Sequence, residues 1–252
     1  MDVVVFAKWV PLGTPELGED RRLVRGRDDG LDAADEFGIE LALQLTERDG
    51  GEVTVVTMGP EGAAAAIQRA LAMGAHRGVL VTDDALAGAD ALATARVLAA
   101  AARRQPFDLV IGGVESSDGY TGTVPSTVAE LLDLPSVTFA RRVDVADGEI
   151  RAERQTAVGY DEVTCALPAL VTLTAGATEP RYPSVKGIMQ AKSKPLDRLG
   201  LADLGLAAGD LAPSQSVRAV EPAPEKPGGE IVEAGEDAIA RIADLLAEAK
   251  VI

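Results

Sequence analysis

Short runs of β-branched residues alternate with longer Ala-, Leu- and Glu-rich stretches through the first two thirds of the chain. Runs such as Val3-Val4-Val5 are apolar at every position, as expected of strands covered on both faces, and the longer stretches carry apolar residues at helical spacing. This alternation predicts βα units on a parallel sheet, and therefore a three-layer, Rossmann-like α/β body. Strands are expected at 2–7, 52–57, 78–82, 108–112, 136–139 and 169–174, and helices at 35–48, 61–73, 89–103 and 123–132.

The pattern changes after residue 140. Two alternating runs meet at Asp147-Gly148, a dipeptide that favours a tight hairpin turn, so we predict a small antiparallel annex at about 141–166. Residues 213–229 are polar and rich in Pro and Gly, which predicts an extended arm. A final helix is expected at 236–249, because apolar residues recur there every three or four positions and give it one apolar face.

The domain division that follows is an α/β domain at 1–192, which includes the annex, and an arm with a C-terminal helix at 193–252. An amphipathic terminal helix after an arm often docks on another surface, either that of a partner subunit or that of its own domain.

Composition excludes several classes of function. The 252 residues carry a formal net charge of −16, which argues against non-specific binding to nucleic acid. With a single cysteine, Cys165, the chain cannot form an intrachain disulfide, and with a single histidine, His76, it lacks the ligands for structural zinc. A Ser/His/Asp triad is not indicated either. No apolar run approaches the roughly 18 residues of a spanning helix, so we expect a soluble, cytoplasmic protein. Six lysines stand against 18 arginines in this acidic chain, a bias that fits a high-salt cytosol.

Ligands of open parallel sheets bind beyond the carboxyl ends of the strands, which here precede the loops at 8–11, 58–61 and 113–125. The third loop runs from a strand through Gly, Ser, Thr and Asp into a helix. Its backbone amides at Thr121, Gly122, Thr123 and Val124 are expected at the helix N-terminus, where a phosphate is attracted. The alternative is that Thr121 or Thr123 is only an N-cap and Asp118-Gly119 only a turn. The Walker and G-x-G-x-x-G patterns are both missing.

Several segments resemble the beta subunit of electron-transfer flavoprotein, over nearly the whole chain. The most specific are AIQRALAMGAHRGVLV at 66–81 and EPRYPSVKGIMQAKSKP at 179–195, and VVVFAKWV, DEFGIELAL, VTMGP, QPFDLVIGG and DGYTGTVP support them in order and spacing. The resemblance implies the adenine-nucleotide α-hydrolase-like variant of a Rossmann-type sheet. It also implies an electron-carrier subunit, rather than a stand-alone enzyme, that accepts electrons from acyl-CoA or other flavin dehydrogenases and passes them to a membrane quinone oxidoreductase.

The resemblance implies cofactors and contact residues as well. FAD is shared with an alpha subunit, and AMP or a second FAD occupies the beta subunit itself. Carried over to this sequence, the nucleotide-binding residues are Ala7, Lys8, Met58, Gly59, Asp118, Gly119, Thr121, Gly122, Thr123 and Val124. The loop at 182–189 resembles the partner-recognition loop, with Val185 as its apolar tip and Tyr182, Ile188 and Met189 around it. No catalytic residue and no metal ligand is implied.

The sequence departs from the family pattern at four places. Gln155 falls where the family has an acidic residue, Asp32-Ala33 replaces an Asn-Pro pair, and His76 replaces an Asp. Asp118-Gly119-Tyr120-Thr121 resembles the opening of the subgroup that holds a second FAD, but with Tyr120 in place of an Asp. Two alternatives therefore stay open beside the carrier: an FAD-binding subunit of an electron-bifurcating, NADH-oxidising complex, and a stand-alone nucleotide-binding stress-type protein.

Overall fold

The structure is a computed structural model that describes residues 1–215, 217–221, 224, 228–235 and 237–252. It forms two compact units, Met1–Val217 and Arg218–Ile252. The division falls later than the boundary at 192 expected from the sequence. The reason is that residues after 192 include β11 (Leu196–Leu199), which pairs in parallel with β5 (Arg77–Val81) of the main sheet.

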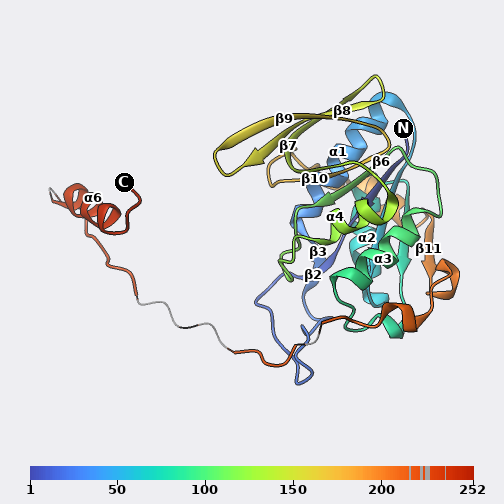
Figure 1. Ribbon diagram of the computed structural model, residues 1–252, viewed down its shortest axis with the longest axis horizontal. Helices are drawn as coiled ribbons and strands as arrows, with labels where there is room; N and C mark the ends of the chain where they lie inside the picture. The colour runs from blue at the N-terminus through green and yellow to red at the C-terminus, as the bar shows by residue number, and fades with distance from the viewer. Residues whose placement is uncertain (216, 222–223, 225–227, 236) are drawn as a thin grey trace. The chain divides into compact units, whose positions relative to one another are not determined.

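The first unit is built on one large, mostly parallel sheet (Figure 1). Within the described residues it has nine strands, in the order β11-β5-β4-β1-β6-β10-β7-β8-β9. Besides β11 and β5, its strands are β4 (Val53–Met58), β1 (Val3–Phe6), β6 (Leu109–Gly113), β10 (Ala169–Leu173), β7 (Ser136–Ala146), β8 (Glu149–Thr156) and β9 (Gly159–Ala166). The central strands β1 and β4 are buried along nearly their whole length, as continuous apolar runs predict.

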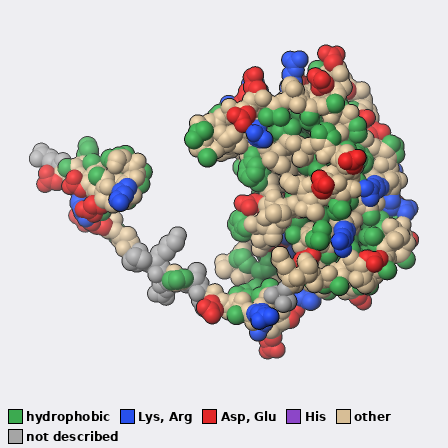
Figure 2. Space-filling view, viewed as in Figure 1, with side chains coloured by type: hydrophobic (Ala, Val, Ile, Leu, Met, Phe, Trp, Pro, Cys, Tyr) green, Lys and Arg blue, Asp and Glu red, His purple; other side chains and the backbone are tan. Residues whose placement is uncertain are grey.

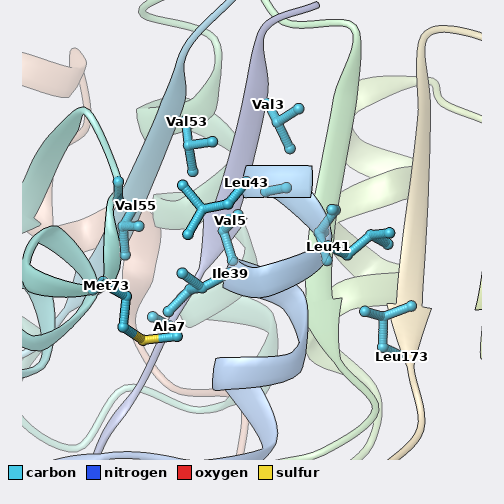
Figure 3. Packing of buried hydrophobic residues seen from close by; sticks show 14 of the residues in the cluster. Val3, Val5, Ala7, Ile39, Leu41, Leu43, Val53, Val55, Met73 and Leu173 are labelled. Atoms are coloured by element: carbon cyan, nitrogen blue, oxygen red, sulfur yellow. The ribbon is translucent and has the colours of Figure 1, made fainter. Parts of the chain in front are cut away.

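Helices cover both faces of this sheet, which makes three layers. The helices α1 (Ala33–Asp49) and α2 (Ala64–Met73) share one hydrophobic core with the sheet, and α3 (Ala91–Ala102) and α4 (Val124–Leu132) share the other. In Figure 3, Ile39 and Leu43 of α1 lie against valines of β1 and β4. The predicted Rossmann-like α/β fold is confirmed.

The annex is an extension of the same sheet. Strand β7 pairs in parallel with β10 and then continues as an antiparallel partner of β8, so it is longer than the predicted strand at 136–139. The registers shift near Phe139, whose φ of 57° marks the irregularity. The β7–β8 turn falls at Asp147-Gly148 as predicted, with φ angles of 55° and 78°. A separate pair, β2 (Trp9–Pro11) with β3 (Asp29–Leu31), was not predicted.

The second unit contains α6 (Ala238–Glu248), within the predicted helix at 236–249; residue 236 lies outside the described residues. Its apolar side chains are open to solvent within this unit (Figure 2), with Ile239 at 81% exposure and Ile242 at 48%. Part of the predicted arm at 213–229 also lies outside the described residues, namely 216, 222–223 and 225–227.

Candidate functional site

Three loops meet at one edge of the sheet. Strands β4, β1 and β6 are neighbours and run in parallel, so the residues that follow them emerge at the same edge. Ala7 and Lys8 follow β1, Met58 and Gly59 end β4, and the loop from Asp118 to Val124 leads from β6 into α4. The structure thus brings all the nucleotide-binding residues predicted from the sequence to one edge.

Asp118 is the centre of an ion-pair cluster on this edge. Its side chain is 3% exposed, and the Lys8 ammonium donates to Oδ1 at 2.7 Å and to Ser116 Oγ at 3.0 Å. The Arg25 guanidinium donates to Asp118 Oδ2 and, at 2.7 Å, to the Trp9 carbonyl. Burial raises the pKa of Asp118, but the two cations outweigh this effect and hold the pKa below its usual value. The cluster therefore carries one more positive than negative charge.

Asp32 holds the loop after β6 in place through Ser117. One carboxylate oxygen accepts from the Ser117 amide at 2.7 Å and from the Ser117 hydroxyl at 3.0 Å, and the other caps α1 by accepting from the Ala34 amide at 3.2 Å. This residue replaces the first member of the Asn-Pro pair of the resembling family. It still binds the loop, because it offers acceptors to two donors.

Asp35 is buried one turn further along α1. Its Oδ2 accepts from the Lys8 amide at 2.6 Å, and its Oδ1 lies so close to Gly113 that a Cβ there would stand 3.1 Å away. Burial raises the pKa of Asp35 to about 8, the Asp32 carboxylate adds to the rise, and the Lys8 hydrogen bond opposes it. At neutral pH this carboxyl is therefore mostly protonated and uncharged.

Asp35→Asn is expected to flatten the pH dependence of stability. The folded pKa of about 8 exceeds the ordinary value of 3.8, so the folded state holds a proton that the unfolded chain releases between these values. Stability of the wild type therefore falls as pH rises through that window, whereas asparagine cannot ionise and can still accept from the Lys8 amide. Urea unfolding should show the variant gaining more than about 1 kcal/mol on the wild type between about pH 5 and about pH 8. Parallel pH profiles would contradict the assignment.

The α4 N-terminus presents backbone donors to the same edge. Among the described residues, none accepts a hydrogen bond from the amides of Thr121, Gly122, Thr123 or Val124. Gly122 has a φ of +61°, in the region that glycine tolerates best. Thr123 precedes the helix but its side chain makes no capping hydrogen bond, and Thr121 and Thr123 are exposed. The geometry thus disagrees with a purely capping role for Thr123.

These donors suit an anionic group. A helix N-terminus with open amides attracts phosphate, and an ammonium and a guanidinium beside it add positive charge. Gly119 keeps space beside the ammonium, since a Cβ on it would stand 3.5 Å from Lys8 Nζ and 3.1 Å from Ser116 Oγ. The residues present therefore fit an anionic group such as a phosphate.

The predicted recognition loop is partly helical. α5 (Val185–Ala191) follows Tyr182 closely, and four apolar side chains of this segment are open to solvent. Ser184 caps α5 by accepting from the Gly187 amide, and a Cβ on Gly187 would stand 2.3 Å from the Ala72 carbonyl, so α5 lies directly on α2. The exposed side chains are Tyr182 at 89%, Val185 at 77%, Ile188 at 52% and Met189 at 72%.

Two basic residues tie this segment to the body. Arg181 donates to Glu40 from Nε at 2.7 Å and from its backbone amide at 3.1 Å, and it also pairs with Glu47. Burial raises the pKa of Glu40, yet Arg181 outweighs it and holds the pKa below its usual value. Lys194 donates to the carbonyls of Leu71, Gly74 and Ala75, at 2.9, 3.1 and 2.6 Å, and so caps the end of α2.

Arg181→Met is expected to destabilise the protein by about 2–4 kcal/mol, because it leaves the Glu40 carboxylate, 5% exposed, without its cation. The double variant Arg181→Met/Glu40→Met should recover part of this loss, since no charge is then left buried. Chemical unfolding of Arg181→Met, Glu40→Met and the double variant tests the pair. A loss of stability in the double variant that equals the sum of the two single losses would contradict it.

Sequence reasoning missed Arg25, Asp35 and Ser117. A signal for the start of α1 was present in the sequence, because Asp32 stands at an N-cap position just before a helical pattern. Arg25 gave no such signal, because it lies in an irregular segment 93 residues from Asp118.

His76 accepts a hydrogen bond from the Val53 amide at 3.0 Å through Nδ1. That contact lies at the start of β4, at the opposite end of the strand from the site. Gln155 is exposed on β8, opposite Tyr160 of β9.

A cleft of about 550 Å³ lies elsewhere, against α3, α4 and the turn at Ala208–Leu211. Its two arginines are engaged with the backbone: Arg96 donates to the Asp210 carbonyl at 2.8 Å and Arg103 to the Leu131 carbonyl. Arg96 thus ties the turn at Ala208–Leu211 to α3, and Arg103 ties α4 to α3. In the described part of the chain, no three acidic, His or Cys residues are grouped to hold a metal ion. No helix in the described part has the length and apolarity to cross a membrane.

Comparison with known proteins identifies the family that the chain resembles over most of its length. Residues 21–204 match the family model described as "Electron transfer flavoprotein domain". The chain is 38% identical to the electron transfer flavoprotein subunit beta of Mycobacterium tuberculosis (strain ATCC 25618 / H37Rv), covering 92% of both chains. It is 39% identical to that of Bacillus subtilis (strain 168), covering 90% of this chain and 91% of the relative. It is also 37% identical, over 92% of both chains, to the caffeyl-CoA reductase-Etf complex subunit CarD of Acetobacterium woodii.

Proposed function

The chain belongs to the electron transfer flavoprotein family as a beta subunit, with an alpha subunit as its partner, and from this premise we propose that it holds a structural AMP in a heterodimeric electron carrier. The observation that carries the proposal is the donor set on one sheet edge: the open amides of Thr121–Val124 beside the cations of Lys8 and Arg25. The contacts proposed for the nucleotide are Ala7, Lys8, Met58, Gly59, Asp118, Gly119, Thr121, Gly122, Thr123 and Val124.

The roles of these groups differ. The amides and the Lys8 ammonium would bind the phosphate, while Ala7, Met58 and Gly59 border the remainder of the nucleotide. Asp118, already neutralised by its two partners, would orient the cations rather than repel the phosphate. Asp35, uncharged at neutral pH, would add no repulsion either. The AMP would thus complete a polar edge without taking part in electron transfer.

The electrons would be carried by an FAD shared with the alpha subunit, which supplies the redox chemistry when bound. This chain would close one side of that FAD. It would dock acyl-CoA dehydrogenases or other flavin dehydrogenases through an apolar segment and then pass electrons to a membrane quinone oxidoreductase. The residues of that segment are Tyr182, Val185, Ile188 and Met189. The open apolar side chains of this segment support docking, because an apolar anchor gives a brief redox contact its specificity. The open apolar face of α6 supports docking of the C-terminal unit on the alpha subunit. A cytoplasmic location fits these partners.

A second candidate has its own support. The relative named as a subunit of a caffeyl-CoA reductase-Etf complex, and the Asp118-Gly119-Tyr120-Thr121 sequence, favour an FAD in place of AMP, in an electron-bifurcating complex that oxidises NADH. Tyr120, exposed and with a φ of 48°, occupies the position where that subgroup has an acidic residue, and so favours AMP.

One experiment separates the two candidates. The heterodimer, purified with its alpha subunit, is mixed anaerobically either with acyl-CoA and an acyl-CoA dehydrogenase or with NADH alone, and flavin absorbance is followed. Bleaching by the first mixture only is the expected result. Rapid bleaching by NADH alone would contradict the carrier and favour the bifurcating complex.

A further inference from the structure

We infer that Arg25 is the second phosphate-binding cation of the nucleotide site, and that Asp118 holds Arg25 and Lys8 together in the absence of phosphate. The inference rests on the proposed function and adds to it a residue from the segment between β2 and β3. The ligand group concerned is a phosphate monoester or diester, and the contact is independent of the nucleoside attached to it.

The geometry of Arg25 leaves it able to bind an anion. Its two terminal nitrogens donate to Asp118 Oδ2 and to the Trp9 carbonyl, one contact each. A guanidinium has five N–H donors, so within the described contacts it keeps three for another acceptor. The side chain is 25% exposed, which places it at the surface of the edge rather than in the core.

Lys8 is in the same situation. Its ammonium uses two of its three donors, on Asp118 Oδ1 and Ser116 Oγ, and its side chain is 44% exposed. Each Asp118 oxygen thus holds one cation, so a single carboxylate keeps both side chains together. Two cations on one carboxylate leave a surplus positive charge, and a phosphate oxygen would balance it better than water does.

Two further carboxylates lie at this edge. Asp32 keeps its negative charge while its oxygens accept hydrogen bonds from Ser117 and from the Ala34 amide. Glu115 lies beside Gly122, since a Cβ there would stand 3.6 Å from its Oε2, and it opposes an anion. Lys8 alone would stand against three carboxylates, Asp118, Asp32 and Glu115, so a second cation beside Lys8 is needed for the edge to hold a phosphate.

The contrast with Arg27 supports a specific role for Arg25. Both arginines lie in the same segment, but Arg27 is 72% exposed and, among the described residues, pairs only with the exposed Glu16, at 2.7 Å. Surface pairs of this kind contribute little to stability or specificity. Arg25, in contrast, joins the segment to the carboxyl edge through two contacts, one with the first residue of β2 and one with the loop after β6.

The test compares ligands that differ by the phosphate. The heterodimer is stripped of retained nucleotide by gel filtration at high salt, and AMP and adenosine are then titrated by calorimetry. Arg25→Gln is compared with the wild type and with the matched control Arg27→Gln. We expect Arg25→Gln to weaken AMP at least about tenfold and to leave adenosine within about twofold, with Arg27→Gln unchanged for both ligands.

Each other outcome has a definite meaning. Equal weakening of AMP and adenosine would show that Arg25 only shapes the loop, and unchanged AMP affinity would show that it takes no part, and either result overturns the inference while the proposed function stands. If the wild-type heterodimer binds neither ligand, the proposed AMP site fails and this inference fails with it. Should Arg25→Gln not fold, Arg25→Lys keeps a charge but not the double contact. It is expected to bind AMP with intermediate affinity, and wild-type affinity in this variant would also contradict the inference.

Discussion

Replacing Gly122 with valine is expected to abolish retention of adenine nucleotide by the purified heterodimer. Gly122 has a φ of +61°, and Tyr120 two residues before it also has a positive φ, so this short loop depends on left-handed backbone. A β-branched residue is strained there by about 1–2 kcal/mol. The loop would relieve the strain by turning its amides away, and the phosphate would lose several donors at once. We expect at least about a hundredfold weaker binding.

The control for this change is Gly205→Val. Gly205 has a φ of +67° and nothing within 4 Å of a Cβ, so valine brings the same backbone strain at a turn that follows β11, which β5 separates from β4 in the sheet. Both variants should therefore lose similar stability, and only Gly122→Val should lose nucleotide, measured by chromatography of the denatured protein. Wild-type nucleotide content in Gly122→Val would remove the loop from the site.

Val185→Asp is expected to slow electron transfer from dehydrogenases without releasing flavin. Val185 is 77% exposed and is the first residue of α5, a position where an acidic side chain interacts favourably with the helix dipole. The change should therefore leave the fold intact while it puts a charge where an apolar anchor is proposed. We expect kcat/KM for a dehydrogenase to fall about 10- to 100-fold.

Leu92→Asp is the matched control, because Leu92 is also exposed, at 39%, and lies in the first turn of a different helix, α3. It should leave both electron transfer and flavin content unchanged. Loss of flavin from Val185→Asp would mean that α5 supports the cofactor rather than the dehydrogenase. Equal slowing in both variants would point to a general effect of added negative charge on an already acidic protein.

The layered architecture was predictable because each element carried its own periodicity. Val3-Val4-Val5 could only be a strand covered on both faces, and the helical spacing of 35–48 placed α1 almost to the residue. Asp147-Gly148 gave the β7–β8 turn for a local reason as well, since both residues adopt positive φ angles. Features governed by local sequence were therefore accessible without coordinates.

Features governed by long-range pairing were not. β11 has only Leu196 and Leu199 as apolar residues and is an edge strand that follows Pro195, so it shows neither alternation nor a continuous run. β2 and β3 have three residues each and are paired across an irregular segment. That segment carries Arg25, whose contact with Asp118 exists only because the β2–β3 pair and the loop after β6 meet at one edge.

The site also has a part that local sequence predicts and a part that it does not. The loop at 118–124 was identifiable because glycines and hydroxyl residues lie between a strand and a helix, where phosphate sites occur. The neutralisation of Asp118 and the protonated state of Asp35 depend on burial and on neighbours distant in sequence, which no spacing encodes.

The most direct test of the proposed carrier is to purify this chain with its alpha subunit, denature the complex and quantify the released FAD and AMP by chromatography and mass spectrometry. The expected result is one FAD and one AMP per heterodimer. Two FAD and no AMP would contradict the proposed AMP site and identify the bifurcating type, and a complex without adenine nucleotide beyond a single FAD would contradict a nucleotide site at this sheet edge altogether.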